Sequence, residues 1–188
     1  SAASDVYKRQ IIDNNTRLLL KLVNDVLELS RIESGNMSFH CEDCSAHHFA
    51  ETVYQTHQVI ILPPVEFIKE FPDEDVTIHI DRMRLTQVIT NFLGNAKKFT
   101  SQGHIKLGYF CDKEKKEIHI FVEDTGAGIP KEELQMIFER FYKRNEFVQG
   151  VGLGLAISKV IVEKMNGHID VQSEVNKGSR FTAVLPYR

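Results

Sequence analysis

The sequence predicts an α+β fold: a two-layer α/β sandwich in which helices cover one face of a mixed, mostly antiparallel sheet. One long bundle helix is expected to precede this sandwich. Strand-like stretches come in pairs and do not alternate regularly with helices, which is typical of α+β rather than α/β proteins. The 188 residues are 42% hydrophobic and 26% charged. That length and composition suit one folded domain with a smaller appendage.

Residues 11–33 are predicted to form the long first helix. Apolar residues recur along it at a spacing of roughly 3.5 residues and make a wide stripe, as in a helical bundle. Gly35 would end this helix in the C′ position. An ordinary packing helix of the main domain is the alternative interpretation. Residues 1–10 carry no usable pattern.

The remaining elements follow from periodicity and from the glycines and prolines that separate them. Helices are expected at residues 47–60, 82–99 and 153–165, with a short helical stretch at 130–138. Strands are expected at residues 65–71, 76–80, 104–111, 117–123, 168–173 and 179–185. The third and fourth strands would form one hairpin, and the last two another. Residues 139–151 are expected to be irregular.

The helix over residues 82–99 presents two different stripes. Its core face is expected to comprise Leu85, Val88, Ile89, Phe92, Ala96 and Phe99. Asn91, Asn95 and Lys98 share the neighbouring stripe. Amide oxygens suit Mg²⁺, and a lysine can lie against phosphate. Taken alone, the two asparagines are explained more simply as solvated side chains.

Asp124 opens a glycine turn, Asp124-x-Gly126-x-Gly128, directly after a predicted strand. The glycines allow positive φ and a close approach of the backbone to a ligand. A buried carboxylate at this point can accept a hydrogen bond from an exocyclic amine such as that of adenine. A simple Asp-initiated turn is the alternative.

A second glycine run, Gly150-x-Gly152-x-Gly154, precedes the last predicted helix. Free N–H groups and the dipole at a helix start favour phosphate. The run is neither a Rossmann fingerprint nor a P-loop. The preceding polar segment includes Arg140, Lys143 and Arg144, and is expected to form a basic lid over phosphates. A plain surface loop is the alternative.

Composition and sequence patterns give no support for several other classes of protein. The net charge of −3, with both signs mixed, gives no indication of nucleic-acid binding. No apolar run approaches the roughly 20 residues of a membrane span, and no signal peptide is apparent. The three cysteines suggest reduced thiols in a cytoplasmic setting. A structural zinc at Cys41, Cys44 and His47 is a less favoured alternative, because no second C-x-x-C follows.

The region from about residue 39 to residue 188 resembles the catalytic ATP-binding domain of bacterial sensor histidine kinases. This domain belongs to the wider ATPase superfamily of DNA gyrases, heat-shock chaperones and mismatch-repair proteins. Residues 84–100 resemble its N box, 124–129 its G1 box, 138–142 its F box, 150–155 its G2 box and 178–181 its last glycine-rich signature.

The resemblance implies a Bergerat-type fold that binds ATP and Mg²⁺. It implies that Asn91 and Asn95 hold Mg²⁺ and phosphate, and that Lys98 touches phosphate. These three are the implied catalytic residues. Asp124 would accept a hydrogen bond from the adenine amine. The other implied nucleotide-binding positions are Phe99, Gly126, Gly128, Ile129, Arg140, Tyr142, Lys143, Gly150, Gly152, Leu153, Gly154 and Ser179.

Asn91 distinguishes between the activities of the superfamily. In its hydrolysing members, a Glu four residues before the metal-binding Asn activates water, and Asn91 holds that place here. A neutral amide cannot act as a general base. The sequence therefore favours transfer of the γ-phosphoryl group of ATP to a histidine, for relay to an Asp of a response regulator. A non-catalytic nucleotide-sensing or scaffold module and a gyrase-like ATPase remain the alternatives.

The same resemblance implies a role for the long first helix. Residues 22–35 resemble the second helix of the dimerisation and phosphoacceptor hairpin of these kinases. Residues 1–36 would thus be a partial dimerisation region, and residues 37–188 the kinase domain. None of the eight histidines has a His-Glu-x-x-x-Pro context, so the acceptor is expected outside this chain. The resemblance implies a cytoplasmic part, monomeric or weakly dimeric, of a homodimeric parent in the bacterial inner membrane.

Overall fold

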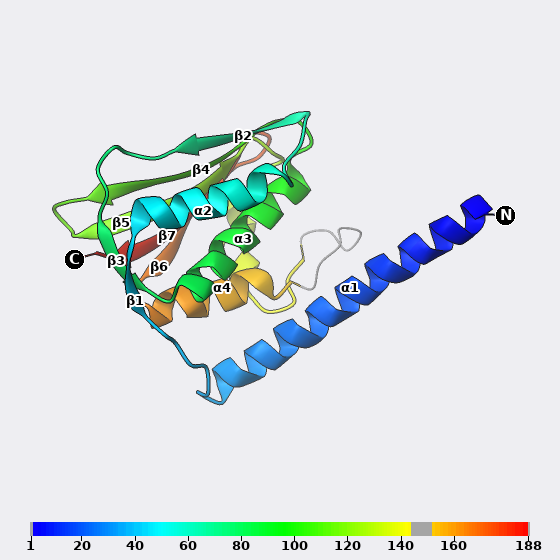
Figure 1. Ribbon diagram of the computed structural model, residues 1–188, viewed down its shortest axis with the longest axis horizontal. Coiled ribbons are helices and arrows are strands. Elements are labelled where there is room, and N and C mark those ends of the chain that lie inside the picture. The colour runs from blue at the N-terminus through cyan, green and yellow to red at the C-terminus, as the bar shows by residue number, and fades with distance from the viewer. Residues whose placement is uncertain (1, 144–151, 188) are drawn as a thin grey trace.

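A five-stranded sheet is the centre of the computed structural model, which describes residues 2–143 and 152–187 (Figure 1). The strand order is β2 (Val65–Glu70), β4 (Gly103–Asp112), β5 (Glu117–Asp124), β7 (Gly178–Pro186) and β6 (His168–Glu174). β2 runs parallel to β4, whereas the other neighbouring strands are antiparallel. The prediction of a mixed, mostly antiparallel sheet is confirmed, as are both predicted hairpins.

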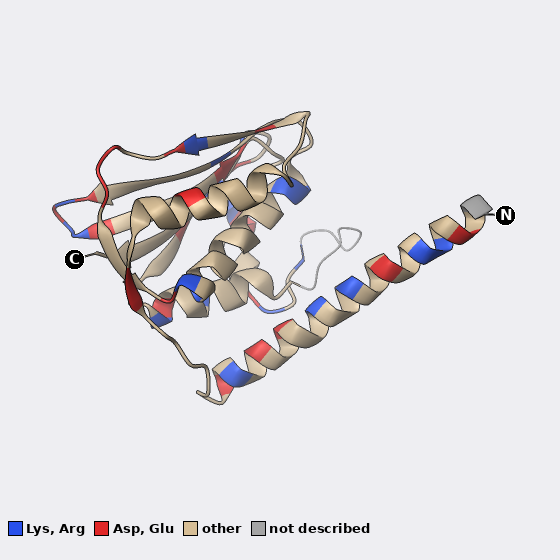
Figure 2. Cartoon of the chain, in the orientation of Figure 1, with Lys and Arg blue, Asp and Glu red and all other residues tan. Residues whose placement is uncertain are grey.

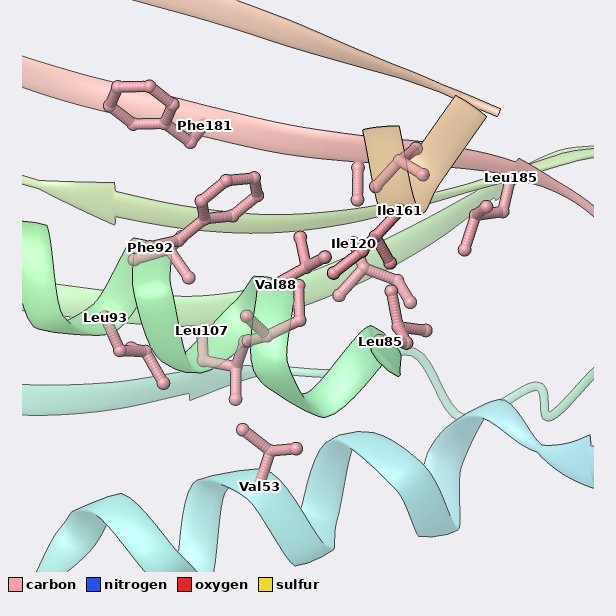
Figure 3. Packing of buried hydrophobic residues seen from close by; sticks show 14 of the residues in the cluster. Val53, Leu85, Val88, Phe92, Leu93, Leu107, Ile120, Ile161, Phe181 and Leu185 are labelled. Atoms are coloured by element: carbon pink, nitrogen blue, oxygen red, sulfur yellow. The ribbon is translucent and has the colours of Figure 1, made fainter. Parts of the chain in front are cut away.

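Three helices, α2 (Ala46–Gln58), α3 (Arg82–Phe99) and α4 (Gly154–Lys164), pack on one face of this sheet (Figure 1). Figure 3 shows Val88 and Phe92 of α3 pointing into the layer between α3 and the sheet, where Ile120 also lies. This layer is the main core, because the same residues are almost fully buried. Burial of such apolar side chains is the dominant favourable contribution to folding.

α3 has the predicted bounds, but one residue of its expected core face is misplaced. Phe99 is 39% exposed and lines a cavity instead of the core. It is the last residue of the helix. Leu93, outside the predicted stripe, is buried, because α2 packs beside α3.

Two short elements differ from the prediction. The sequence did not indicate β1 (Glu42–Ser45), which pairs antiparallel with β3 (Thr77–Ile80). β1 has only four residues and no alternating apolar pattern, so periodicity could not reveal it. The expected helical stretch at 130–138 consists of two 3₁₀ turns, Lys131–Glu133 and Met136–Phe138.

The long helix α1 (Ala2–Glu33) begins earlier than predicted, because residues 2–10 are also helical. It ends as expected at Gly35, which has a φ of 70°. The Asn36 N–H donates to the Arg31 carbonyl at 2.9 Å, and the Gly35 N–H donates to the Ile32 carbonyl at 3.1 Å. These two bonds form a Schellman motif, in which glycine adopts the left-handed conformation without a Cβ penalty.

α1 contacts the rest of the molecule through its C-terminal turns, and its N-terminal part projects away (Figure 1). Leu29 is buried there. The Glu28 carboxylate accepts hydrogen bonds from Arg84 and, at 2.6 Å, from Gln87 Nε2. Basic and acidic residues are interspersed along α1 (Figure 2). No helix of residues 2–143 and 152–187 is long and apolar enough to cross a membrane.

Candidate functional site

A cavity of about 940 Å³ lies among α1, α3, α4 and the end of β5. Its volume falls within the range of small-molecule sites, so a ligand the size of a nucleotide fits. The predicted site positions that line it are Asn91, Asn95, Lys98, Phe99, Asp124, Gly128, Ile129, Tyr142, Lys143, Gly152, Leu153, Gly154 and Ser179. The structure therefore brings together residues from motifs that lie far apart in the sequence.

Two predicted positions within the described residues, Gly126 and Arg140, do not line the cavity. The backbone N–H of Gly126 donates to Asp124 Oδ1 at 2.8 Å. The Arg140 guanidinium forms an ion pair with Glu33 at the end of α1. Gly150 lies outside the described residues, as does Arg144 of the expected lid.

Asn91 is held between α3 and α4. Its Nδ2 donates to the hydroxyl of buried Ser158 at 3.2 Å. Its Oδ1 lies beside the backbone of Gly154, where a Cβ would come closer than 3.0 Å to this oxygen. Asn95, one turn further along α3, is likewise half-buried and lines the same cavity. Two amide groups are thus presented side by side by one rigid helix.

Asp124 is a buried acceptor at the end of β5. The side chain is 7% exposed, and this burial raises the pKa of its carboxyl above the ordinary value, while the hydrogen bond from the Gly126 N–H opposes that shift. Asp124 pairs in register with Ser179 of β7, which also lines the cavity. A carboxylate in this setting can accept a hydrogen bond from an amine of a ligand.

The turn after Asp124 is packed so tightly that it needs a glycine. Gly128 has a φ of 67°, and a Cβ on it would come closer than 3.0 Å to the Glu174 carbonyl oxygen. The next residue, Ile129, donates its N–H to Ser173 Oγ at 2.7 Å. These contacts hold the turn against the β6–β7 hairpin and place Ile129 at the cavity.

Three lysines, Lys21, Lys98 and Lys143, line the cavity. Partial burial lowers the pKa of Lys98 below its ordinary value, and the positive charges of Lys143 and Lys21 lower it further. Lys21 also donates to the carboxylate of Asp25 at 3.0 Å. A cluster of ammonium groups in a cavity attracts anionic ligands.

Several lining residues were not predicted. They are Lys21, Asp25, Arg82, Met83, Thr86, Gln87, Thr90, Gly94, Ile137, Leu155, Ile157, Ser158 and Phe181. Gln87 and Gly94 lie three or four residues from Asn91 on the same helix, so helical spacing could have indicated them. No sequence signal indicated Lys21 and Asp25, because only the docking of α1 brings them to the cavity.

The possible zinc ligands near residues 40–48 do not form a cluster. Within residues 2–143 and 152–187, no three His, Cys, Asp or Glu side chains are arranged to hold a metal ion. Cys41, Cys44 and Cys111 are free thiols. His47 Nδ1 lies 3.4 Å from the Tyr109 hydroxyl.

Comparison with known sequences identifies the family to which the chain is similar. A family model described as histidine kinase-, DNA gyrase B-, and HSP90-like ATPase matches residues 80–188. The sensor histidine kinase WalK of Bacillus subtilis (strain 168) is 34% identical over 183 residues, which are 95% of this chain and 30% of WalK. The sensor histidine kinase RcsC of Escherichia coli (strain K12) is 36% identical over 181 residues, which are 93% of this chain and 19% of RcsC. The chain spans less than a third of the length of these relatives.

Solved structures share the fold. Full-length ShkA in complex with AMPPNP superposes with a TM-score of 0.81 at 29% identity, over 90% of this chain and 36% of ShkA. The nucleotide-free catalytic domain of the histidine kinase ThkA gives a TM-score of 0.69 at 29% identity, over 80% of this chain and 96% of that domain. Both matches confirm the predicted α+β architecture.

Proposed function

The chain belongs to the family of histidine kinase-, DNA gyrase B-, and HSP90-like ATPases, and from this premise we propose a phosphotransfer function. The chain is the catalytic, ATP-binding part of a two-component sensor histidine kinase. It transfers the γ-phosphoryl group of ATP to a histidine of a separate phosphoacceptor domain, for relay to a response-regulator Asp. The eight histidines all lie within residues 2–143 and 152–187, and none of them is among the described residues that line the cavity, which supports an acceptor supplied from elsewhere.

One observation carries this proposal: Asp124, the amides of α3 and a group of lysines line the same cavity. Asp124 accepts a hydrogen bond from the exocyclic amine of adenine. Lys98 and Lys143 bind the phosphates. The N-cap of α4 is Leu153, which has no side-chain acceptor, so the N–H groups of the first turn stay available to an anion.

The amides of α3 also fit a magnesium site. Asn91 and Asn95 are half-buried, line the cavity and carry the hard oxygen ligands that Mg²⁺ accepts. Both would hold the ion, which supplies charge neutralisation for the phosphate oxygens. The hydrogen bond to Ser158 uses the Asn91 nitrogen, and this leaves the amide oxygen as the group available for such a contact.

Transfer is favoured over hydrolysis by the acid–base groups of the cavity. Asn91 is a neutral amide and cannot abstract a proton from water. In the described part of the chain, the carboxylates that line the cavity belong to Asp25 and Asp124. Asp25 is paired with Lys21, and Asp124 is assigned to adenine. An acceptor imidazole is its own nucleophile, so the chain mainly positions charge.

The exposed apolar residues of α1 support the assignment of residues 1–36 to the dimerisation region of a larger kinase. Val6, Tyr7, Ile12, Leu19, Leu20 and Leu27 are all more than half exposed. A helix with such residues is suited to pack into a bundle with further helices. In the proposed parent, a homodimer of the bacterial inner membrane, these residues contact the other helices of the hairpin.

Calorimetric titration with a non-hydrolysable ATP analogue and Mg²⁺ tests binding. We expect saturable binding to one site, and no binding at millimolar nucleotide would overturn the proposal. Adding a separate phosphoacceptor hairpin domain and labelled ATP tests transfer, with label expected on histidine. Steady phosphate release without the acceptor would instead favour a gyrase-like ATPase.

A further inference from the structure

Lys21 reaches the cavity from α1, outside the region that matches the ATPase family. We propose that Lys21 is an additional phosphate-binding cation, so that the affinity for nucleotide phosphates depends on the docking of α1. This inference rests on the proposed ATP-binding function and extends it to a residue of the long helix.

Polar contacts at the C-terminal end of α1 hold Lys21 in place. Glu28, two turns after Lys21, accepts hydrogen bonds from both Arg84 and Gln87 of α3. The exposed fraction of the side chain is only 16% for Glu28 and 23% for Arg84. Leu29 is buried beside them. α1 is therefore anchored on the surface of α3 close to the cavity.

The neighbours of Lys21 show what kind of ligand the position suits. Its positive charge is one of the causes that lower the pKa of Lys98, together with the charge of Lys143. Three ammonium groups that repel one another in one cavity gain most from a multiply charged anion. The polyphosphate chain of a nucleotide is such an anion.

Asp25 competes for the same ammonium group. The pair is an i,i+4 ion pair on α1 with an N–O distance of 3.0 Å, and the side chains are 58% exposed for Lys21 and 15% exposed for Asp25. Exposed pairs of this type are weak. Since Asp25 also lines the cavity, its charge opposes phosphate binding, and its removal should free Lys21.

Lys21→Met is the direct test, with Lys8→Met on the same helix as a matched control that does not line the cavity. Calorimetry would compare the Mg²⁺ complex of a non-hydrolysable ATP analogue with adenosine. We expect Lys21→Met to weaken analogue binding about fivefold, the upper end for an exposed charge contact, and to leave adenosine binding unchanged. Asp25→Asn should strengthen analogue binding, and Lys8→Met should match the wild type.

The double variant Lys21→Met/Glu28→Ala tests whether the affinity for nucleotide phosphates depends on the docking of α1. In Glu28→Ala the effect of Lys21→Met should become smaller, because Lys21 is no longer held at the cavity. An unchanged analogue affinity in Lys21→Met would overturn the inference, and so would an equal loss for adenosine, which would indicate a structural role. Failure of the wild type to bind the analogue would refute the proposed function itself.

Discussion

The backbone of Gly154, the first residue of α4, lies against the side-chain amide of Asn91 on α3. One turn further along α4, Ser158 accepts a hydrogen bond from the same amide at 3.2 Å. α4 therefore holds Asn91 from two positions, and a Cβ at position 154 would have to displace the Asn91 amide.

Gly154→Ala should damage the site while the chain remains folded. The new Cβ would displace the Asn91 amide, and we expect the affinity for the Mg²⁺ complex of an ATP analogue to fall about tenfold, the usual effect of losing a contact to a charged group. Gly94→Ala on α3 is the control for stability, since nothing lies within 4 Å of its Cβ position. That change should raise the free energy of unfolding by about 0.5–1 kcal/mol. Wild-type affinity in Gly154→Ala would contradict the proposed role of Asn91.

Asn95→Ala should abolish measurable nucleotide binding or phosphoryl transfer, because it removes one of two amides proposed to hold the metal and phosphate. Alanine favours the helix, so thermal unfolding should show an intact fold. Asn14→Ala on exposed α1 is the matched control. Unchanged transfer in Asn95→Ala would remove Asn95 from the site.

Asp124→Asn should weaken binding of the nucleotide while it stabilises the folded protein. A neutral acceptor binds the adenine amine less strongly, and we expect affinity for the ATP analogue to fall about tenfold. The folded-state pKa of Asp124 is raised above its ordinary 3.8 by burial, so its ionisation begins to destabilise the folded protein as the pH rises above 3.8, and the loss is complete above the folded-state pKa. The variant lacks this cost. Its gain in melting temperature should be small below about pH 3.8 and should increase as the pH rises.

The pH profile of that difference is the measurement. Thermal unfolding of wild type and variant between about pH 3 and pH 7 should give curves that diverge as the pH rises. Curves that converge toward neutral pH would contradict the raised pKa of Asp124.

Nucleotide affinity should decrease at alkaline pH through Lys98. The pKa of Lys98 is lowered from 10.5 by burial and by Lys143 and Lys21, and bound phosphate would raise it again. Binding is therefore linked to proton uptake, and the affinity falls as the pH rises through the pKa of the free protein. Calorimetry between about pH 8 and pH 10 checks this. Lys98→Met should bind more weakly and show a flatter profile; an unchanged profile would argue against Lys98 as a phosphate ligand.

Leu29→Ala should loosen the docking of α1. Leu29 is 9% exposed, whereas Leu27 on the same helix is 53% exposed. We expect a loss of about 2 kcal/mol for Leu29→Ala and less than about 0.5 kcal/mol for Leu27→Ala, measured by urea unfolding. Hydrogen exchange of residues 28–33 should rise in the first variant alone. Equal effects would show that α1 is not anchored at this position.

Local patterns in the sequence determined much of the fold. The bounds of α3 followed from its apolar period, and the structure shows that Asp81 caps its start by accepting from the Arg84 N–H at 3.0 Å. Gly35 marked the end of α1 because only a residue that tolerates positive φ closes a helix in this way. The stripe of Asn91, Asn95 and Lys98 was visible because helical spacing is a local property. Their proposed roles remain predictions.

Tertiary structure alone decided the features that depend on contacts between distant segments. β1 is too short to show a period and exists through its pairing with β3. Phe99, the last residue of α3, lines the cavity instead of the core. Arg140 pairs with Glu33 because α1 ends beside it. Lys21 came to the cavity through contacts of Glu28 and Leu29 with the body of the domain. Periodicity shows which face of a helix is apolar, but the packing of one element on another decides which side chains share a site.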